Sequence, residues 1–174
     1  LPLSDQPNYA YDSLVSVTSN VILSKESTGY GLINRDGDNI LDPVIDEITY
    51  MGDDFFFAKN GKEYILIKAM TNKADIRYTS YHKITIDNDV ILEYIHGRLR
   101  RVMKRDGILL DAVGMESVTK TGRNHYTISF KDGRLGLLND KGNWEVTPTP
   151  NIQQLFPGDE GLNGALIDGK YGFV

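Results

Sequence analysis

The sequence of 174 residues predicts an all-β fold built from tandem copies, and three observations carry that prediction. Glycines recur at a constant spacing of 36 residues, at Gly61, Gly97, Gly133 and Gly169. The segments on both sides of these glycines are short and rich in β-branched and aromatic residues, as half-buried strands are. No segment has the 3.6-residue apolar spacing of a helix. We therefore expect strands joined by turns and almost no helix.

The turns at these glycines predict hairpins. Three of the glycines follow Asn or Asp and one follows a histidine, and all four precede a basic residue; the preceding residues are Asn60, His96, Asp132 and Asp168. Asn-Gly and Asp-Gly favour the two-residue type I′ turn, because both central residues need a positive φ. Strand-like segments flank each turn, as at 55–58 and 63–67.

Two further landmarks recur with the hairpins. A second polar turn appears at 35–37, 105–107 and 140–142. Pairs of apolar residues three positions apart begin at Tyr11, Ile45, Tyr81, Met115 and Ile152. Together they divide a single repeat domain, 1–174, into five copies of about 35 residues, approximately 1–37, 38–72, 73–107, 108–142 and 143–174.

Each copy is expected to form three antiparallel strands, which are marginal alone and stable when neighbouring copies share a core. We expect the copies to continue as an open twisted β array. The alternative is a small closed β-propeller, whose blades usually need about four strands and at least about 40 residues.

The composition fits a soluble globular domain and excludes several classes. Hydrophobic residues make up 40% and charged residues 25% of the chain. The net charge of −5 opposes a surface that binds nucleic acid over its whole area. The chain contains no cysteine, so it has no disulfide, thiolate metal site or cysteine nucleophile. No apolar run approaches the roughly 18 residues of a membrane span.

Three segments, 29–37, 133–142 and 168–174, combine an aromatic or apolar residue with glycine and an apolar pair, and in 29–37 and 133–142 a polar turn ending in glycine follows. In this they resemble the WG-containing repeat family. The position of the family's Trp is held by Tyr30 and Tyr171 in two copies, and the paired glycine is kept as Gly31, Gly136 and Gly172. Elsewhere the pattern is lost, at Glu63, Tyr64, Leu99, Arg100 and Leu135.

The resemblance implies a β-rich repeat protein of a kind common in bacteria and often exported, with no shared catalytic site to carry over. A glycine inside a strand marks a bulge or a close approach, so an aromatic ring could lie over each one. We expect Tyr30 and Tyr171 to pack in the core.

Basic residues supply the first candidate binding surface. The stretch 98–105 holds five positive charges in eight residues, four of them the candidate partner-binding residues Arg98, Arg100, Arg101 and Arg105. Strand alternation places Arg98 and Arg100 on one face and Arg101 and Arg105 on the other. A row of bases after the hairpin turns, Lys62, Arg98, Arg134 and Lys170, suits an anionic polymer. Exposed turn positions and a charged protective sheet edge explain the same residues without a ligand.

Aromatic and acidic residues supply the second candidate surface. Tyr78 and Tyr81 could present rings to a sugar or peptide, and acidic turns at 36–38, 53–54 and 87–89 offer oxygens to calcium. None of these turns matches a known calcium loop, and Asp and Asn also favour turns for their own hydrogen bonds. The histidines, His82, His96 and His125, lack metal-ligand spacing.

The chain also lacks a G-x-S-x-G elbow, a P-loop and a dinucleotide fingerprint, so we expect no enzyme, no catalytic residues and no cofactor. The expected function is a non-catalytic repeat module that presents an extended β surface to a protein or a cell-envelope component. A glycan- or calcium-binding module is the alternative. Because the chain begins at Leu1, we expect an upstream leader or tag to have been removed. We expect an extracytoplasmic location, periplasmic or on the cell surface, with the cytoplasm as the alternative.

Overall fold

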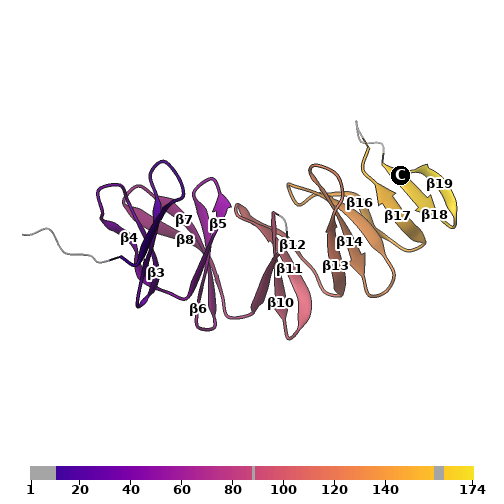
Figure 1. Ribbon diagram of the computed structural model, residues 1–174. Helices are drawn as coiled ribbons and strands as arrows, with labels where there is room; N and C mark the ends of the chain where they lie inside the picture. The colour runs from indigo at the N-terminus through magenta and orange to yellow at the C-terminus, as the bar shows by residue number, and fades with distance from the viewer. Residues whose placement is uncertain (1–10, 88, 159–162) are drawn as a thin grey trace, which may run out of the picture. The chain divides into compact units, whose positions relative to one another are not determined.

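A computed structural model describes residues 11–87, 89–158 and 163–174 of the chain. In this part of the chain the fold is all-β, with 19 strands in five antiparallel sheets and no helix (Figure 1). The predicted all-β class is therefore confirmed. Among the described residues no helix has the length and apolar character needed to cross a membrane. The chain divides into two compact units, Leu1–Tyr81 and His82–Val174.

The first unit contains two sheets of four strands. The first sheet comprises β1 (Ser13–Ser16), β2 (Ile22–Glu26), β3 (Gly29–Ile33) and β4 (Asn39–Ile45). The second comprises β5 (Glu47–Gly52), β6 (Phe55–Asn60), β7 (Glu63–Met70) and β8 (Lys73–Ser80). Each strand pairs with the next one in the chain.

The second unit contains three sheets with the same sequential pairing. The third sheet comprises β9 (Lys83–Asp87), β10 (Val90–Ile95), β11 (Arg98–Lys104) and β12 (Gly107–Asp111). The fourth comprises β13 (Met115–Lys120), β14 (His125–Phe130), β15 (Leu135–Asn139) and β16 (Trp144–Thr149). The fifth comprises β17 (Ile152–Phe156), β18 (Gly164–Ile167) and β19 (Lys170–Phe173).

The expectation of three strands per copy is wrong for four of the five sheets, which have four. The additional strand follows the second polar turn, as β4 does after 35–37 and β16 after 140–142. Prolines made this segment look like a connecting loop. Pro43 and Pro148 lie where the pairing register is interrupted, so the strand continues on both sides of them.

The predicted type I′ turn forms at two of the four hairpins. His96 and Gly97 have φ values of 50° and 74°, and Asp168 and Gly169 have 49° and 73°. At the first hairpin Asn60 instead pairs with Glu63, which makes Gly61 and Lys62 the turn residues. The Phe130–Arg134 hairpin is one residue longer, with the Phe130 amide donating to the Arg134 carbonyl oxygen at 2.9 Å.

The cores of both units lie between successive sheets. In the first unit, Leu32 and Ile45 of the first sheet join a cluster with Phe56 and Ile67 of the second. The fourth sheet buries both of its faces. Leu138 belongs to the cluster shared with the third sheet, and its neighbour Leu137 belongs to the cluster shared with the fifth. Such nearest-neighbour burial is how a repeat array gains stability.

A polar contact also joins the third and fourth sheets. The Tyr126 hydroxyl donates to Asp89 Oδ2 at 2.8 Å, and Lys120 Nζ donates to Asp89 Oδ1 at 3.0 Å. Lys104 Nζ lies 3.3 Å from the same carboxylate. Partial burial raises the pKa of Asp89, but the hydrogen bonds from Lys120, Tyr126 and Lys104 outweigh it and lower the pKa to about 2.

Candidate functional site

A cavity of about 340 Å³ in the second unit contains two of the candidate partner-binding arginines. We call it the basic cavity. The residues that line it come from the β10–β11 hairpin, the connection into β13 and the β14–β15 turn: Ile95, His96, Arg98, Leu99, Arg100, Val113, Gly114, Met115 and Lys131.

The local structure of β11 explains how its arginines are distributed. Leu99 pairs with Tyr94 and Arg101 pairs with Glu93, so Arg100 is an extra residue without a partner in β10. This β-bulge breaks the strict alternation of side chains along the strand. As a result Arg100 and Arg101 both reach the carboxylate of Asp111 on β12. The prediction that Arg100 and Arg101 point to opposite faces is therefore wrong.

Arg101 has a structural role. Its guanidinium donates to Glu93 Oε2 at 2.8 Å and to Asp111 Oδ2 at 2.9 Å. Glu93 is fully buried, and the ion pair with Arg101 helps to offset the cost of burying its carboxylate. The hydrogen bond from Arg101, together with the charge of Arg100, lowers the pKa of Asp111. Arg105 lies half-buried in the β11–β12 turn and does not line the basic cavity.

The charge of the basic cavity comes from its rim. Arg98 and Lys131 are exposed, and neither forms an ion pair with any residue that the structure describes. Arg100 adds a third cation, although Asp111 partly neutralises it. None of the lining residues is a carboxylate. The rim is therefore suited to an anion.

The floor of the basic cavity is apolar. Leu99 is 5% exposed and Met115 is 1% exposed, and both belong to the core between the third and fourth sheets. A rigid apolar floor under positive side chains can contact an apolar group while the rim contacts a charge. The arrangement therefore suits a ligand that carries an acid next to an apolar group.

The two candidate tyrosines lie in the first unit and do not line the basic cavity. Tyr78 is half-buried in β8, opposite Leu66 of β7. Tyr81 is 71% exposed. Its hydroxyl is hydrogen-bonded to the Glu63 carboxylate, which raises the pKa of Tyr81. Only Tyr81 presents an open ring of the kind expected.

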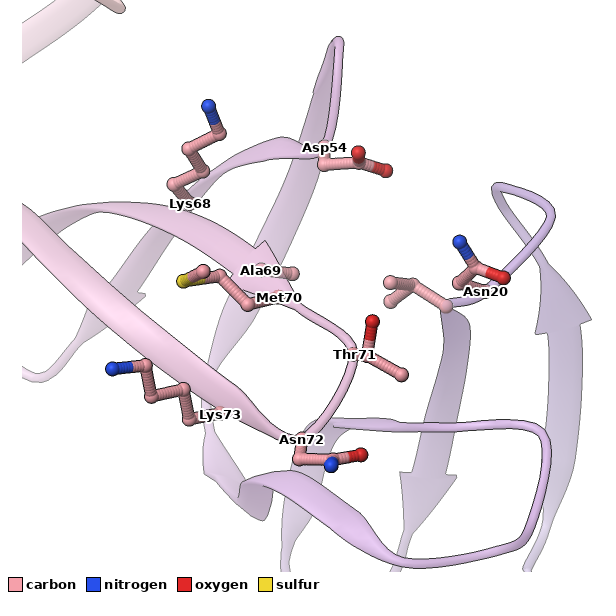
Figure 2. Close-up of a pocket in the computed structure, with 9 residues that line it drawn as sticks. Asn20, Asp54, Lys68, Ala69, Met70, Thr71, Asn72 and Lys73 are labelled. Atoms are coloured by element: carbon pink, nitrogen blue, oxygen red, sulfur yellow. The ribbon is translucent and has the colours of Figure 1, made fainter.

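A second cavity, of about 490 Å³, lies in the first unit where the β1–β2, β5–β6 and β7–β8 turns meet. We call it the polar cavity. In Figure 2 the side chains of Asp54, Asn20 and Asn72 lie to the right of the ends of β7 and β8. The side chains of Lys68, Met70 and Lys73 extend to the left. Of this site the sequence indicates only the acidic turn at 53–54, because only the packing of the first sheet on the second brings Asn20 near Asp54.

The other two acidic turns are held by hydrogen bonds and ion pairs within the protein. Asn34 Oδ1 accepts from the amides of Asp36 and Asp38 at 3.0 and 2.8 Å. Asp89 is engaged by Lys104, Lys120 and Tyr126, and Asn88 of the same turn lies outside the described residues. Within residues 11–87, 89–158 and 163–174, no group of three or more His, Asp or Glu residues is placed to hold a metal ion.

The other bases of the predicted row and two of the histidines, His82 and His125, do not line the basic cavity, whereas His96 does. Arg134 pairs with Asp132 at 2.8 Å and lies over the Phe130 ring, whereas Lys62 and Lys170 are exposed. Of this predicted row, only Arg98 lines the basic cavity. His125 Nε2 lies 2.9 Å from Glu145 Oε2, and the rings of His82 and His96 are 6.4 Å apart.

Comparisons with known proteins find similar solved structures and no similar sequence. No family model and no curated protein sequence matches the chain. The chain is similar to BamB from Moraxella catarrhalis, with 12% identity, a TM-score of 0.33 and coverage of 91% of this chain and 56% of BamB. It is similar to the computationally designed Ika8 protein, with 9% identity, a TM-score of 0.35 and coverage of 92% and 57%.

A third likeness is to the WD40 β-propeller domain of Doa1. Its identity is 10%, its TM-score is 0.34, and the match covers 90% of this chain and 76% of that domain. The chain spans little more than half the length of BamB and of Ika8.

Proposed function

We propose that this chain is a non-catalytic interaction module whose basic cavity binds an acidic segment of a protein partner. The observation that supports this is the combination in one cavity of Arg98, Arg100 and Lys131 with an apolar floor and no carboxylate. A glutamate or aspartate next to a large apolar residue would satisfy both parts of the site. Charged hydrogen bonds to such a site are typically worth about 1.5–3 kcal/mol each.

The proposal extends to the class of protein. We propose membership in the WG-containing repeat family, on the segments 29–37, 133–142 and 168–174. We also propose an extracytoplasmic location, because the resemblance is to a family that is often exported. The arrangement of the five sheets as an open array stays a prediction, which the radius of gyration in solution would test against a closed ring.

The binding proposal is tested with a fluorescent peptide, Glu-Leu-Glu-Phe, and its neutral counterpart, Gln-Leu-Gln-Phe. We expect saturable binding of the acidic peptide that weakens as salt rises, because exposed charges are screened. The double variant Arg98→Gln/Lys131→Gln should lose at least about tenfold in affinity, equivalent to about 1.4 kcal/mol. Both side chains are exposed and lack ion pairs with the described residues, so the variant should fold.

Lys170→Gln is the matched control, since Lys170 is an exposed base after another hairpin turn of the same unit. It should bind the acidic peptide as the parent protein does. Equal affinity of the double variant and the parent, or equal binding of the acidic and neutral peptides, would overturn the proposal.

The polar cavity of the first unit supports a second candidate function, glycan binding. Asp54, Asn20, Thr71 and Asn72 supply the carboxylate, amide and hydroxyl groups that hydrogen-bond to sugar hydroxyls. Retention on immobilised oligosaccharides that is lost in Asp54→Ala but kept in Arg98→Gln/Lys131→Gln would favour it.

A further inference from the structure

Two histidines lie next to each other in the second unit, and one of them lines the basic cavity. His96 occupies the β10–β11 turn with a φ of 50°, and His82 directly precedes β9. The centroids of the two rings are 6.4 Å apart, and both side chains are exposed. His96 shares the basic cavity with Arg98, Arg100 and Lys131. An exposed pair of imidazoles therefore adjoins the cationic rim.

In two other sheets the corresponding positions form a hydrogen bond that caps the hairpin turn. The Gly61 amide donates to Asp46 Oδ2 at 2.6 Å, and the Gly169 amide donates to Gln153 Oε1 at 2.9 Å. Asp46 and Gln153 each follow the first residue of a predicted apolar pair, as His82 does in the third copy. The third copy therefore places titratable rings where these copies place a turn residue and the side chain that caps it.

Histidine is the side chain whose charge ordinarily changes between about pH 5 and 8. The chain has three histidines and no cysteine. The third histidine, His125, does not line the basic cavity, and its Nε2 lies 2.9 Å from Glu145 Oε2. A change in the affinity of the basic cavity within this pH range would therefore point to His82 and His96.

The side chains that share the basic cavity with His96 are positively charged or uncharged. Arg98 and Arg100 come from β11, Lys131 comes from the β14–β15 turn, and none of the lining residues is a carboxylate. Other charged groups of the adjoining strands and turns have partners of their own or lie outside the cavity: Glu93 with Arg101, Asp111 with Arg100 and Arg101, Asp132 with Arg134, Lys83 over the Tyr94 ring, and the exposed Glu116 of β13. A bound acidic segment would therefore bring new carboxylates close to His96.

We propose that protonation of His82 and His96 strengthens the binding of an acidic segment to the basic cavity, so that acid regulates this site. The inference rests on the proposed function and names its regulation. A carboxylate bound at the rim favours the protonated ring, because opposite charges attract at short range. By thermodynamic linkage, the protonated ring favours the bound carboxylate to the same extent. The affinity should therefore rise as the pH falls through the range in which histidine gains its proton.

The test measures the affinity for Glu-Leu-Glu-Phe, with acetylated and amidated ends, at about pH 7.5 and about pH 5.5 and at constant ionic strength. The glutamates of the peptide, with an ordinary pKa of about 4.3, stay ionised over this range. We expect the affinity to rise about threefold to tenfold on acidification, since each exposed ion pair is weak. The stabilising contribution of Asp89 is lost only below about pH 4, so it is present at both values.

The variant His82→Gln/His96→Asn removes both rings. Gln is the residue of the fifth sheet at the first position, as Gln153, and Asn tolerates the positive φ of the turn. The variant should bind the peptide as the parent does at the higher pH and should gain nothing on acidification. His125→Gln is the matched control, since it removes the third histidine and should keep the full rise.

The outcomes separate this inference from the proposed function. A parent affinity that is equal at both pH values would overturn the inference and leave the acidic-peptide site in place. A rise that persists in His82→Gln/His96→Asn would also overturn it. The absence of binding at both pH values would overturn both proposals. An independent measurement is the NMR titration of the His96 ring, whose midpoint saturating peptide should move to higher pH; an unchanged midpoint would contradict the linkage.

Discussion

The fourth and fifth sheets of this protein carry related sequences in different surroundings. The fourth sheet lies between two neighbours and buries Leu138 on one face and Leu137 on the other. The fifth sheet buries Leu155 and Ala165 against the fourth. Its last strand, by contrast, leaves Tyr171 and Phe173 largely exposed.

The comparison teaches that the repeat pattern specifies a strand and its glycine, whereas the neighbouring strands decide whether the same position is core or surface. Gly136 and Gly172 make the point most directly. Both pair with a fully buried residue of the preceding strand, and only Gly136 is covered by a fourth strand. The expectation that Tyr171 packs in the core is wrong for this reason.

Truncation of buried and exposed apolar residues should show the largest contrast. Leu138→Ala removes a fully buried side chain and should lower the free energy of unfolding by about 2–5 kcal/mol, because it leaves a cavity. Phe173→Ala should change it by no more than about 0.5 kcal/mol. Urea denaturation of both variants measures the difference. Comparable losses would mean that Phe173 is covered in solution.

The equivalent glycines give a smaller contrast with a matched substitution. Gly136→Ala should cost about 1–3 kcal/mol, because its Cβ would collide with Trp144 and Pro148. Gly172→Ala should cost about 0.5 kcal/mol or less, because its Cβ meets nothing. The same urea titration compares the two. A large loss in Gly172→Ala would break the comparison, since it would require a covering strand already in place.

Acid should weaken the attachment of the fourth sheet through Asp89. Its pKa of about 2 lies below the ordinary value of 3.8, so the carboxylate stabilises the fold above about pH 4. This contribution should disappear as the pH falls from about 4 to 2. Because the Asp89 side chain is 41% exposed, we expect about 1 kcal/mol after allowing for solvent screening.

Asp89→Asn is the control for the acid effect, since it cannot titrate. The difference in free energy of unfolding between parent and variant, measured from pH 6 to pH 2, should shrink by about this amount. A difference that stays constant over this range would show that the carboxylate does not stabilise the third and fourth sheets.

The candidate site was only partly predictable for a specific physical reason. The run of bases at 98–105 predicts Arg98 and Arg100 as binding residues, and both line the basic cavity. Arg101 belongs to the same run, but it pairs with the buried Glu93. The bulge at Arg100 and the proximity of Lys131 arise from strand register and sheet packing. Neither is visible in the spacing of charges along the chain.

The sequence by itself determined the all-β class, the hairpins and the recurrence of the strands, because these depend on short-range features. Alternating apolar residues and turn glycines act within a few positions of one another. The first strand of every sheet contains the second residue of a predicted apolar pair: Leu14, Ile48, Ile84, Val118 and Leu155.

Only the tertiary structure decided the fourth strands and the two cavities. Each depends on which distant segments meet. Prolines in β4 and β16 disfavour a strand locally, and the fourth strands accommodate them in register interruptions opposite Gly31 and Gly136. Whether a residue is buried or forms an ion pair depends on neighbours that lie many residues away in the chain. Local sequence therefore could not distinguish the covered Gly136 from the open Gly172.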